Sequence, residues 1–342
     1  MRNVLTDVAG VTVGHATDVV LGSGVTAILF DRPATAAVAV LGGAPGGRDT
    51  GLLAPEMTVE AVDAIVLSGG SAFGLDAAGG VQAALREMGR GYAIRDARVP
   101  IVPQAIIFDL LNGGDKDWGR FAPYRELGYA AACAASGTFA QGSVGAGTGA
   151  TTAVVKGGVG SASAVTSAGH TVGAIAVVNA VGSPLIGDGP WFWAAPYEQQ
   201  CEFGSLGWPA RIDATLRLKG GPGTSTTIGL VATDAALSKA QAFRLAVMAH
   251  DGLARAVLPA HAPLDGDTMF AAATGHRRLG DSAGELVELG FTATLTMARA
   301  IARGVYAATA LPVANAQPAW RDRFAATRDG NFTSAINGVQ GD

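Results

Sequence analysis

Four consecutive hydroxyl side chains, Thr224, Ser225, Thr226 and Thr227, lie between a Gly/Pro turn and an apolar run in GPGTSTTIGLVAT (221–233). A Ser or Thr hydroxyl at such a position can attack the carbonyl of its own preceding peptide bond and form an ester, which water then hydrolyses. The new α-amine has a reference pKa of about 7.7–8.0, so it is partly neutral at pH 7 and can accept the hydroxyl proton. Thr also favours strands and Ser/Thr favour turns, so the cluster alone is weak evidence for self-cleavage.

Other catalytic patterns are weak. The five histidines have no HxH or HExxH spacing and the two cysteines form no CxxC, so we expect neither a metal nor a cofactor. One G-x-S-x-G match surrounds Ser282, but the preceding residues 275–279 (GHRRL) are charged where a nucleophile elbow needs an apolar strand. Ser282 is therefore predicted to cap a helix.

Two Gly-rich segments, 42–51 and 141–152, could present backbone N–H groups to an anion. Neither contains GxxxxGK[ST], and neither follows the order of strand, GxGxxG and helix that dinucleotide sites require. We predict that both are turns that allow backbones to approach closely.

Composition limits the partners. The net charge of −4 comes without a basic cluster, which argues against nucleic acid, and no 18-residue apolar stretch or signal peptide is recognisable. Two cysteines in 342 residues suit a reducing compartment, so we expect a cytoplasmic protein. Only 15% of the residues are charged, which predicts burial of surface between subunits in a homo-oligomer.

Strand-like and helix-like patterns alternate along the chain, which predicts an α/β fold. The predicted strands are 11–16, 24–30, 36–43, 63–70, 170–182, 226–233 and 267–275, and the predicted helices are 73–88, 126–135, 237–257 and 282–308. No linker marks a domain boundary, so 1–342 is predicted to be a single domain. The final stretch from Asn315 loses the apolar periodicity and is interpreted as a surface tail or a strap onto a neighbouring subunit.

Seven sequence blocks together resemble the L-aminopeptidase/D-esterase family, which includes β-peptidyl aminopeptidases and nylon-oligomer hydrolases. The blocks are LTDVAGVTVGHATD (5–18), GGAPGGRDTGLL (42–53), LSGGSAFGLDAAGGV (67–81), QGSVGAGTGAT (141–151), VVNAVG (177–182), TTIGLVATDA (226–235) and LDGDTMFAAATG (264–275). The resemblance implies a four-layer α/β/β/α sandwich with two β-sheets between helical layers. It also implies self-cleavage into an α chain, 1–225, and a β chain, 226–342, that stay associated.

Alignment on the VATDA block implies that Thr226 is the nucleophile and that the Ser225–Thr226 bond is cleaved. The family more often has Gly or Asn before the nucleophile, so Ser225 is a departure, and Thr224, Ser225 and Thr227 remain alternatives. Asn179, in VVNAVG, corresponds to a family Asn that helps to bind the oxyanion.

Asp265 and Asp267 flank Gly266 in a pattern that resembles the nylon hydrolases. Two converging carboxylates would raise each other's pKa unless an ammonium lies between them, and the α-ammonium of Thr226 would supply that charge. The resemblance therefore implies that the pair orients the amine and hydroxyl of Thr226.

Two further positions depart from the family. A catalytic Lys of the nylon hydrolases corresponds to Val154 here, with Lys156 two residues later, either as a substitute or as a solvated residue. A family Tyr near the oxyanion site corresponds to Phe108. Lys156 and Phe108 are thus candidate substrate-binding residues, whereas Asp109 and Glu56 are unranked candidates for binding a substrate ammonium.

These features predict a cofactor-free hydrolase that acts on small peptides or amides, assembled as a tetramer of αβ units. Two alternatives remain open. An acyltransferase like ornithine acetyltransferase has a similar fold and a self-generated Thr, and an uncleaved binding or scaffold protein would retain the fold without the chemistry.

Overall fold

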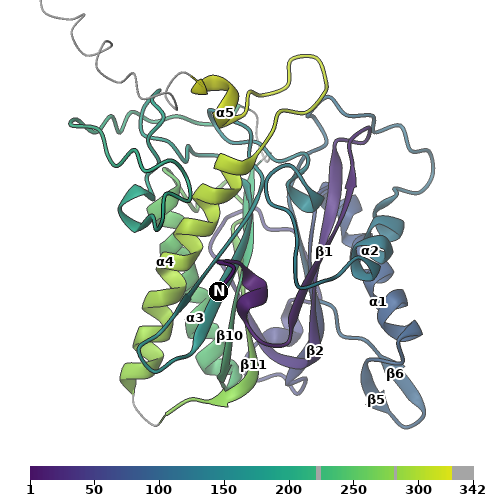
Figure 1. Cartoon of the computed structure of the whole chain (residues 1–342). Helices are drawn as coiled ribbons and strands as arrows, with labels where there is room; N and C mark the ends of the chain where they lie inside the picture. The colour runs from purple at the N-terminus through teal and green to yellow at the C-terminus, as the bar shows by residue number, and fades with distance from the viewer. Residues whose placement is uncertain (221–224, 281–282, 326–342) are drawn as a thin grey trace, which may run out of the picture.

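The computed structural model describes residues 1–220, 225–280 and 283–325 (Figure 1). The strands are β1 (Val11–Asp18), β2 (Ser23–Val40), β3 (Gly47–Arg48), β4 (Ala61–Ser68), β5 (Tyr92–Ile94), β6 (Ala97–Val99), β7 (Gln104–Ile106), β8 (Val159–Val165), β9 (Thr171–Asn179), β10 (Thr226–Ala236) and β11 (Thr268–Arg278). The α-helices are α1 (Ala77–Glu87), α2 (Tyr124–Cys133), α3 (Lys239–Ala256), α4 (Ala283–Ala307) and α5 (Trp320–Arg323). This alternation confirms the predicted α/β class.

Nine of these strands form one hydrogen-bonded sheet in the order β3-β7-β4-β2-β11-β10-β9-β8, with β1 paired to β2, while β5 and β6 form a separate hairpin. Strand β10 lies at the centre of one half, antiparallel to β9 and parallel to β11. Strand β2 is 18 residues long and pairs with β4 between Val25 and Thr35 and with β11 between Thr35 and Val40. It joins the strand layers because it continues from one into the other.

Three apolar clusters separate four layers. One cluster packs β2 and β4 against α1 and α2, and another packs β9, β10 and β11 against α3 and α4. The third cluster lies between the strand layers and contains, for example, Ile65 from β4 and Leu230 from β10. Helices consequently cover both outer faces of the strands, as Figure 1 shows, in agreement with the predicted sandwich. The two strand layers belong to one hydrogen-bonded sheet, however, and not to the two sheets that were predicted, because β2 runs through both layers.

Residues 315–325 correct the expectation of a surface tail, whereas a strap onto a neighbouring subunit stays a prediction. The Trp320 side chain is only 1% exposed, stacks on Phe192 with ring centroids 5.8 Å apart, and donates its indole N–H to Pro190 O at 3.0 Å. This segment therefore packs on its own chain. Its Arg and Asp residues suggested an exposed segment, although the single Trp320 side chain among them is buried and anchors it. Residues 326–342 lie outside the described residues.

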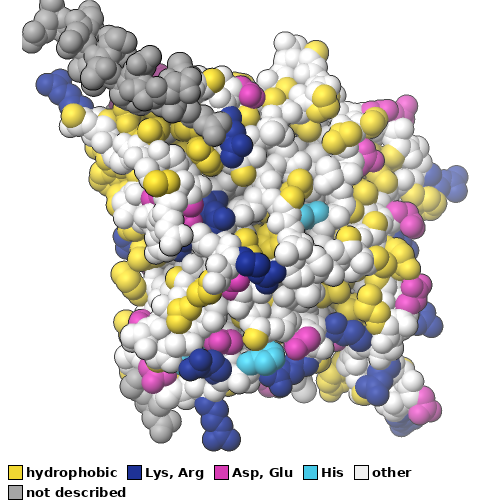
Figure 2. All heavy atoms as spheres, viewed as in Figure 1, with side chains coloured by type: hydrophobic (Ala, Val, Ile, Leu, Met, Phe, Trp, Pro, Cys, Tyr) yellow, Lys and Arg dark blue, Asp and Glu magenta, His cyan; other side chains and the backbone are white. Residues whose placement is uncertain are grey.

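Charged side chains are sparse on the surface. Figure 2 shows Lys and Arg scattered among Asp and Glu on one face, without a continuous basic band. Among the described residues, no helix is long and apolar enough to span a bilayer.

Candidate active site

Thr226 is the first residue of β10, and its Cα pairs with that of Asn179 at the end of β9. Side chains alternate along a strand, and Ile228 and Leu230 contribute to the cluster between the strand layers. Thr226 shares their face, whereas Thr227 faces the helical layer with Val231. The strand geometry thus places Thr226 and Asn179 side by side at one edge of the space between the layers.

The carbonyl of Ser225, which would be attacked in self-cleavage, accepts two hydrogen bonds. The Thr226 hydroxyl donates to it at 2.5 Å, and the Gly266 N–H donates at 3.1 Å. The Ser225 and Thr227 hydroxyls are buried and have no hydrogen-bond partner among the described residues. Thr224 lies outside the described residues. Of the three described hydroxyls, only that of Thr226 contacts a peptide carbonyl in this way.

The space around position 266 leaves no room for a side chain. A Cβ there would lie 2.7 Å from Thr226 Oγ1 and 2.7 Å from Ala44 O. Gly42 lies below the same segment, where a Cβ would meet Asp267 N at 2.3 Å. The Gly-rich segment 42–51 therefore brings backbone close to the LDGD turn, as predicted.

Asp265 and Asp267 lie immediately before β11, beside the start of β10. Asp267 accepts the Thr227 N–H at 2.8 Å through Oδ1, and it accepts the backbone N–H of His261 at 2.9 Å through Oδ2. Asp265 is the bridge partner of Ser225 and accepts the Val181 N–H at 3.1 Å. Both acids thus hold backbone around Thr226, and among the described residues neither forms a hydrogen bond to the Thr226 side chain.

Burial and the nearby Asp267 carboxylate raise the pKa of Asp265 to about 6. Asp267 contacts a residue that the sequence analysis missed, because His261 Nδ1 lies 2.9 Å from Asp267 Oδ2. The sequence shows only that His261 lies six residues before Asp267. The two side chains meet because the turn between them folds back, which the sequence spacing alone does not predict.

The amide of Asn179 is held from three sides. Its Oδ1 accepts the Thr151 N–H at 3.0 Å and the Lys219 ammonium at 2.8 Å, and its Nδ2 donates to Phe108 O at 3.1 Å. Two donors on Oδ1 fix which side of the amide carries the N–H groups. Phe108 therefore contacts the predicted oxyanion residue through its backbone, which any side chain at that position would allow.

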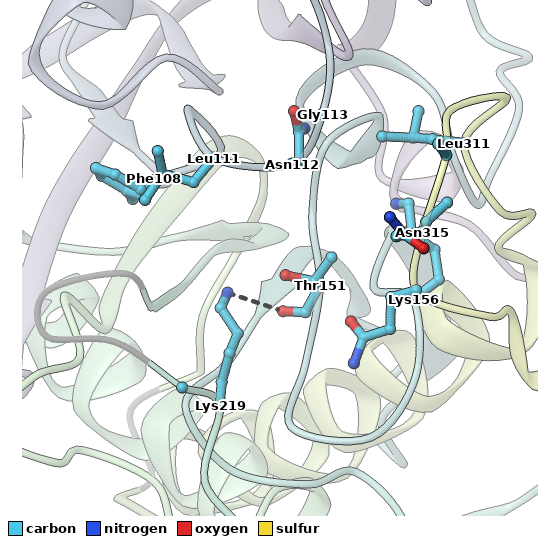
Figure 3. A pocket seen from close by; sticks show the side chains of 13 residues that line it. Phe108, Leu111, Asn112, Gly113, Thr151, Lys156, Lys219, Leu311 and Asn315 are labelled. Carbon is cyan, nitrogen blue, oxygen red and sulfur yellow. Dashed lines mark hydrogen bonds between the residues drawn. The ribbon is translucent and has the colours of Figure 1, made fainter.

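A cavity of about 430 Å³ adjoins Asn179, and Figure 3 shows Phe108 and Leu111 on one side of it and Leu311 and Asn315 on the other. Its lining is Phe108, Leu111, Asn112, Gly113, Thr151, Lys156, Lys219, Gly220, Leu311, Ala314, Asn315, Ala316 and Gln317. Thr226 is not among them and is 4% exposed, but Asn179 links it to Thr151 and Lys219. The cavity is therefore the candidate substrate pocket.

Lys156 is 1% exposed, so the solvated alternative is wrong. It follows a tight turn in which Thr151 and Lys156 form a β-bridge, and its ammonium donates to Gly147 O and Gly157 O, both at 2.9 Å. Burial lowers the pKa of Lys156 to about 7. The structure thus brings Lys156 and Phe108, both predicted from the sequence, to one cavity.

Lys219 is a second residue that the sequence analysis missed. Its ammonium donates to Thr151 O at 3.2 Å, in addition to Asn179, and burial lowers its pKa to about 7. It precedes the Gly/Pro turn in LKGGPG, where a single Lys carries no pattern.

The two candidates for binding a substrate ammonium do not line the cavity. Asp109 is buried, accepts the Ser23 hydroxyl and the Gly70 N–H at 2.7 Å each, and has a pKa raised by burial. Glu56 is exposed. Ser282 lies outside the described residues, among which no three His, Cys, Asp or Glu side chains converge to hold a metal ion.

A sequence profile described as Peptidase family S58 matches residues 3–318. The chain belongs to peptidase family S58. Uncharacterized aminopeptidases of Mycobacterium bovis and Mycobacterium leprae are 44% and 42% identical to this peptidase, over 94% and 90% of its chain and 98% and 91% of theirs. The protein is therefore a hydrolase that acts on peptide bonds, and the predicted family is confirmed.

Solved structures show the same fold as this peptidase. A β-aminopeptidase from Burkholderia sp. has a TM-score of 0.69 at 24% identity, over 96% of this chain and 92% of that chain. The L-aminopeptidase D-Ala-esterase/amidase from Ochrobactrum anthropi, described as a variant of the Ntn hydrolase fold, has a TM-score of 0.68 at 21% identity, over 94% and 91%. These similarities support the predicted α/β fold.

Proposed function

We propose that this peptidase cleaves its own Ser225–Thr226 bond and then hydrolyses peptides or amides through Thr226 as an N-terminal nucleophile. The observation that carries the proposal is the pair of donors on one carbonyl: Thr226 Oγ1 and Gly266 N–H both contact Ser225 O. The first donor is the attacking atom, and the second can stabilise the negative charge that develops on the oxygen.

Self-cleavage proceeds in two steps, an acyl shift to the hydroxyl and hydrolysis of the resulting ester. Thr226 Oγ bonds to the Ser225 carbonyl carbon, the bond from that carbon to the Thr226 nitrogen breaks, and the hydroxyl proton ends on that nitrogen. Water then hydrolyses the ester, which leaves a carboxylate on Ser225 and a free hydroxyl and amine on Thr226. The α chain would be 1–225 and the β chain 226–342.

Turnover repeats this chemistry on a substrate. The Thr226 amine takes the hydroxyl proton during attack and gives it to the leaving amine, and water releases the acyl group. Asn179, fixed by Thr151 and Lys219, supplies an amide N–H to the oxyanion. Asp265 and Asp267 lie beside the new amine, where their charge favours its protonated form between turnovers and their hydrogen bonds hold the strand end that carries it.

The strand itself provides a matched test. Thr226→Ala removes the proposed nucleophile, and Thr227→Ala removes an equally buried hydroxyl on the opposite face of β10. We expect Thr226→Ala to remain one 34 kDa band on a denaturing gel and Thr227→Ala to give two fragments. If Thr226→Ala is still cut, the assignment of the nucleophile is wrong.

We also propose that αβ units associate as a tetramer in the cytoplasm. Helices α3 and α4 carry the exposed apolar side chains Phe243, Val287 and Phe291, which a subunit interface would cover. Cys133 and Cys201 are exposed and free, which suits a reducing compartment. Light scattering should give a particle near four times 34 kDa, and a stable 34 kDa particle at micromolar concentration would contradict the assembly.

A further inference from the structure

Among the residues that the structure describes, the lining of the cavity beside Asn179 contains two lysines and no acidic side chain. Lys156 and Lys219 both point their ammonium groups at neutral oxygens, namely backbone carbonyls and the Asn179 amide. Among the described residues, no carboxylate lies within the 4.0 Å of an ion pair from either ammonium. Lys156, which is buried, and Lys219, which is half-buried, therefore share one pocket without an ion-pair partner among the described residues, and their charged forms are costly there unless an anion joins them.

More distant carboxylates offset only part of the effect of burial on the pKa of the two lysines. Asp109 acts on both lysines and Asp265 acts on Lys219, yet burial still dominates and holds the pKa of each lysine near 7. Asp109 is engaged by Ser23 and Gly70. Lys239 provides a contrast, because it is equally buried outside this cavity and its ammonium donates to three carbonyls, those of Leu52, Met57 and Val59.

Lys156 differs from Lys239 because its ammonium has two hydrogen-bond acceptors among the described residues for three N–H groups, so one N–H can serve a ligand. The cavity also has the Asn315 amide and apolar surface from Leu111 and Leu311, whereas the amide nitrogens of Asn112 and Gln317 already donate to backbone carbonyls. A short acyl chain that ends in an oxygen anion matches this set, since charge-assisted hydrogen bonds to an ammonium are among the strongest available. A second ammonium would instead add to the repulsion.

The cavity lies on the acyl side of the bond that is proposed to be cleaved. In the uncleaved chain, Lys219 and Gly220 precede the Ser225 carbonyl and therefore lie on the acyl side of the bond that Thr226 attacks. A substrate must place its own carbonyl where that of Ser225 lies, so the rest of its acyl group extends towards the cavity.

We infer that this cavity binds a carboxylate, and that the preferred substrate is a peptide or amide whose acyl group carries one. The inference rests on the proposed function, with Thr226 as the nucleophile. Two sources share this chemistry: an acidic residue at the N-terminus of a peptide, which also has an α-ammonium, and the monoamide of a dicarboxylic acid, which has none.

Binding tests the cavity without turnover. Calorimetry on full-length Thr226→Ala should show that glutarate binds at least about tenfold more tightly than 1,5-pentanediol. Adding Lys156→Met should remove this advantage, whereas adding the matched change Lys239→Met should preserve it. Equal affinities for the two probes, or a glutarate advantage that survives Lys156→Met, would overturn the carboxylate site.

Hydrolysis then tests the substrate class on the wild-type protein. The kcat/KM for glutaryl p-nitroanilide should exceed that for pentanoyl p-nitroanilide by about 10- to 100-fold, and 5-aminopentanoyl p-nitroanilide should be slowest. A faster α-glutamyl p-nitroanilide would identify acidic peptide N-termini as the source, and a faster glutaryl compound would identify dicarboxylic monoamides. Preference for the aminopentanoyl compound would refute the carboxylate inference alone. Glutarate binding without cleavage of any anilide would instead refute the proposed function, and with it the substrate assignment.

Discussion

Gly266→Ala should stop self-cleavage through the space that one methyl group occupies. The new Cβ would lie 2.7 Å from Thr226 Oγ1, 3.1 Å from Thr226 Cγ2 and 2.7 Å from Ala44 O. Ordinary van der Waals contact begins near 3.4 Å, so the distance from the new methyl to Thr226 Oγ1 would be too short by roughly 0.7 Å. Because Ala44 O is backbone, we expect the Thr226 side chain to move.

The expected loss in the rate of self-cleavage follows from the two contacts that this movement would disturb. A misplacement of about 1 Å costs on the order of 10² in rate, and disturbing an oxyanion donor such as Gly266 N–H costs about 10²–10³. We therefore expect processing to slow by at least about 10²-fold. Cell-free synthesis with timed samples on a denaturing gel follows the 34 kDa precursor directly.

The matched control is Gly51→Ala, because a Cβ at Gly51 meets no atom within 4 Å. That variant should process at the parental rate. If Gly266→Ala also processes at the parental rate, with circular dichroism showing a native fold, then the contact between Gly266 and Thr226 does not position the nucleophile.

Three further predictions concern the acid pair, the C-terminal segment and the buried lysine. Asp267→Asn should lower kcat/KM for an amide by about 10²–10⁴ while slowing processing less, since the amine it serves does not exist in the precursor; unchanged hydrolysis would make Asp267 a turn residue. Trp320→Ala should lower the free energy of unfolding by about 3–5 kcal/mol in urea titrations, and a loss below about 1 kcal/mol would contradict its role as an anchor. Burial lowers the pKa of Lys156 to about 7, so the folded protein binds fewer protons than the unfolded chain between that pH and about 10. Parental stability should therefore rise with pH across this range, the rise should be smaller in Lys156→Met, and Tm curves that stay parallel from pH 6 to pH 10 would refute this.

Periodicity predicted most of the fold because the central strands are buried on both faces and appear as continuous apolar runs. The prediction missed strands β3, β5, β6, β7 and β8, and it gave β2 as two strands, 24–30 and 36–43. Pro33 suggested a break between them, but the strand continues and its pairing with β4 shifts register between Leu29 and Ala34. Proline is tolerated at such an irregularity, so the sequence signal for a strand end was also compatible with a bulge.

The site was only partly predictable. Thr226, Asn179 and the Asp265–Asp267 pair belong to local blocks, and the structure brings these blocks to one edge of the strand layers. Lys219 was not predictable because its role depends on Asn179, which is 40 residues away in the sequence and becomes its neighbour only after folding.

The most direct test of the central claim is the intact mass and N-terminal sequence of the purified wild-type protein. We expect two chains whose masses sum to that of the full sequence plus one water, with the smaller beginning TTIGLVATDA at Thr226. A single full-length chain, or a second N-terminus at Thr224, Ser225 or Thr227, would contradict the account.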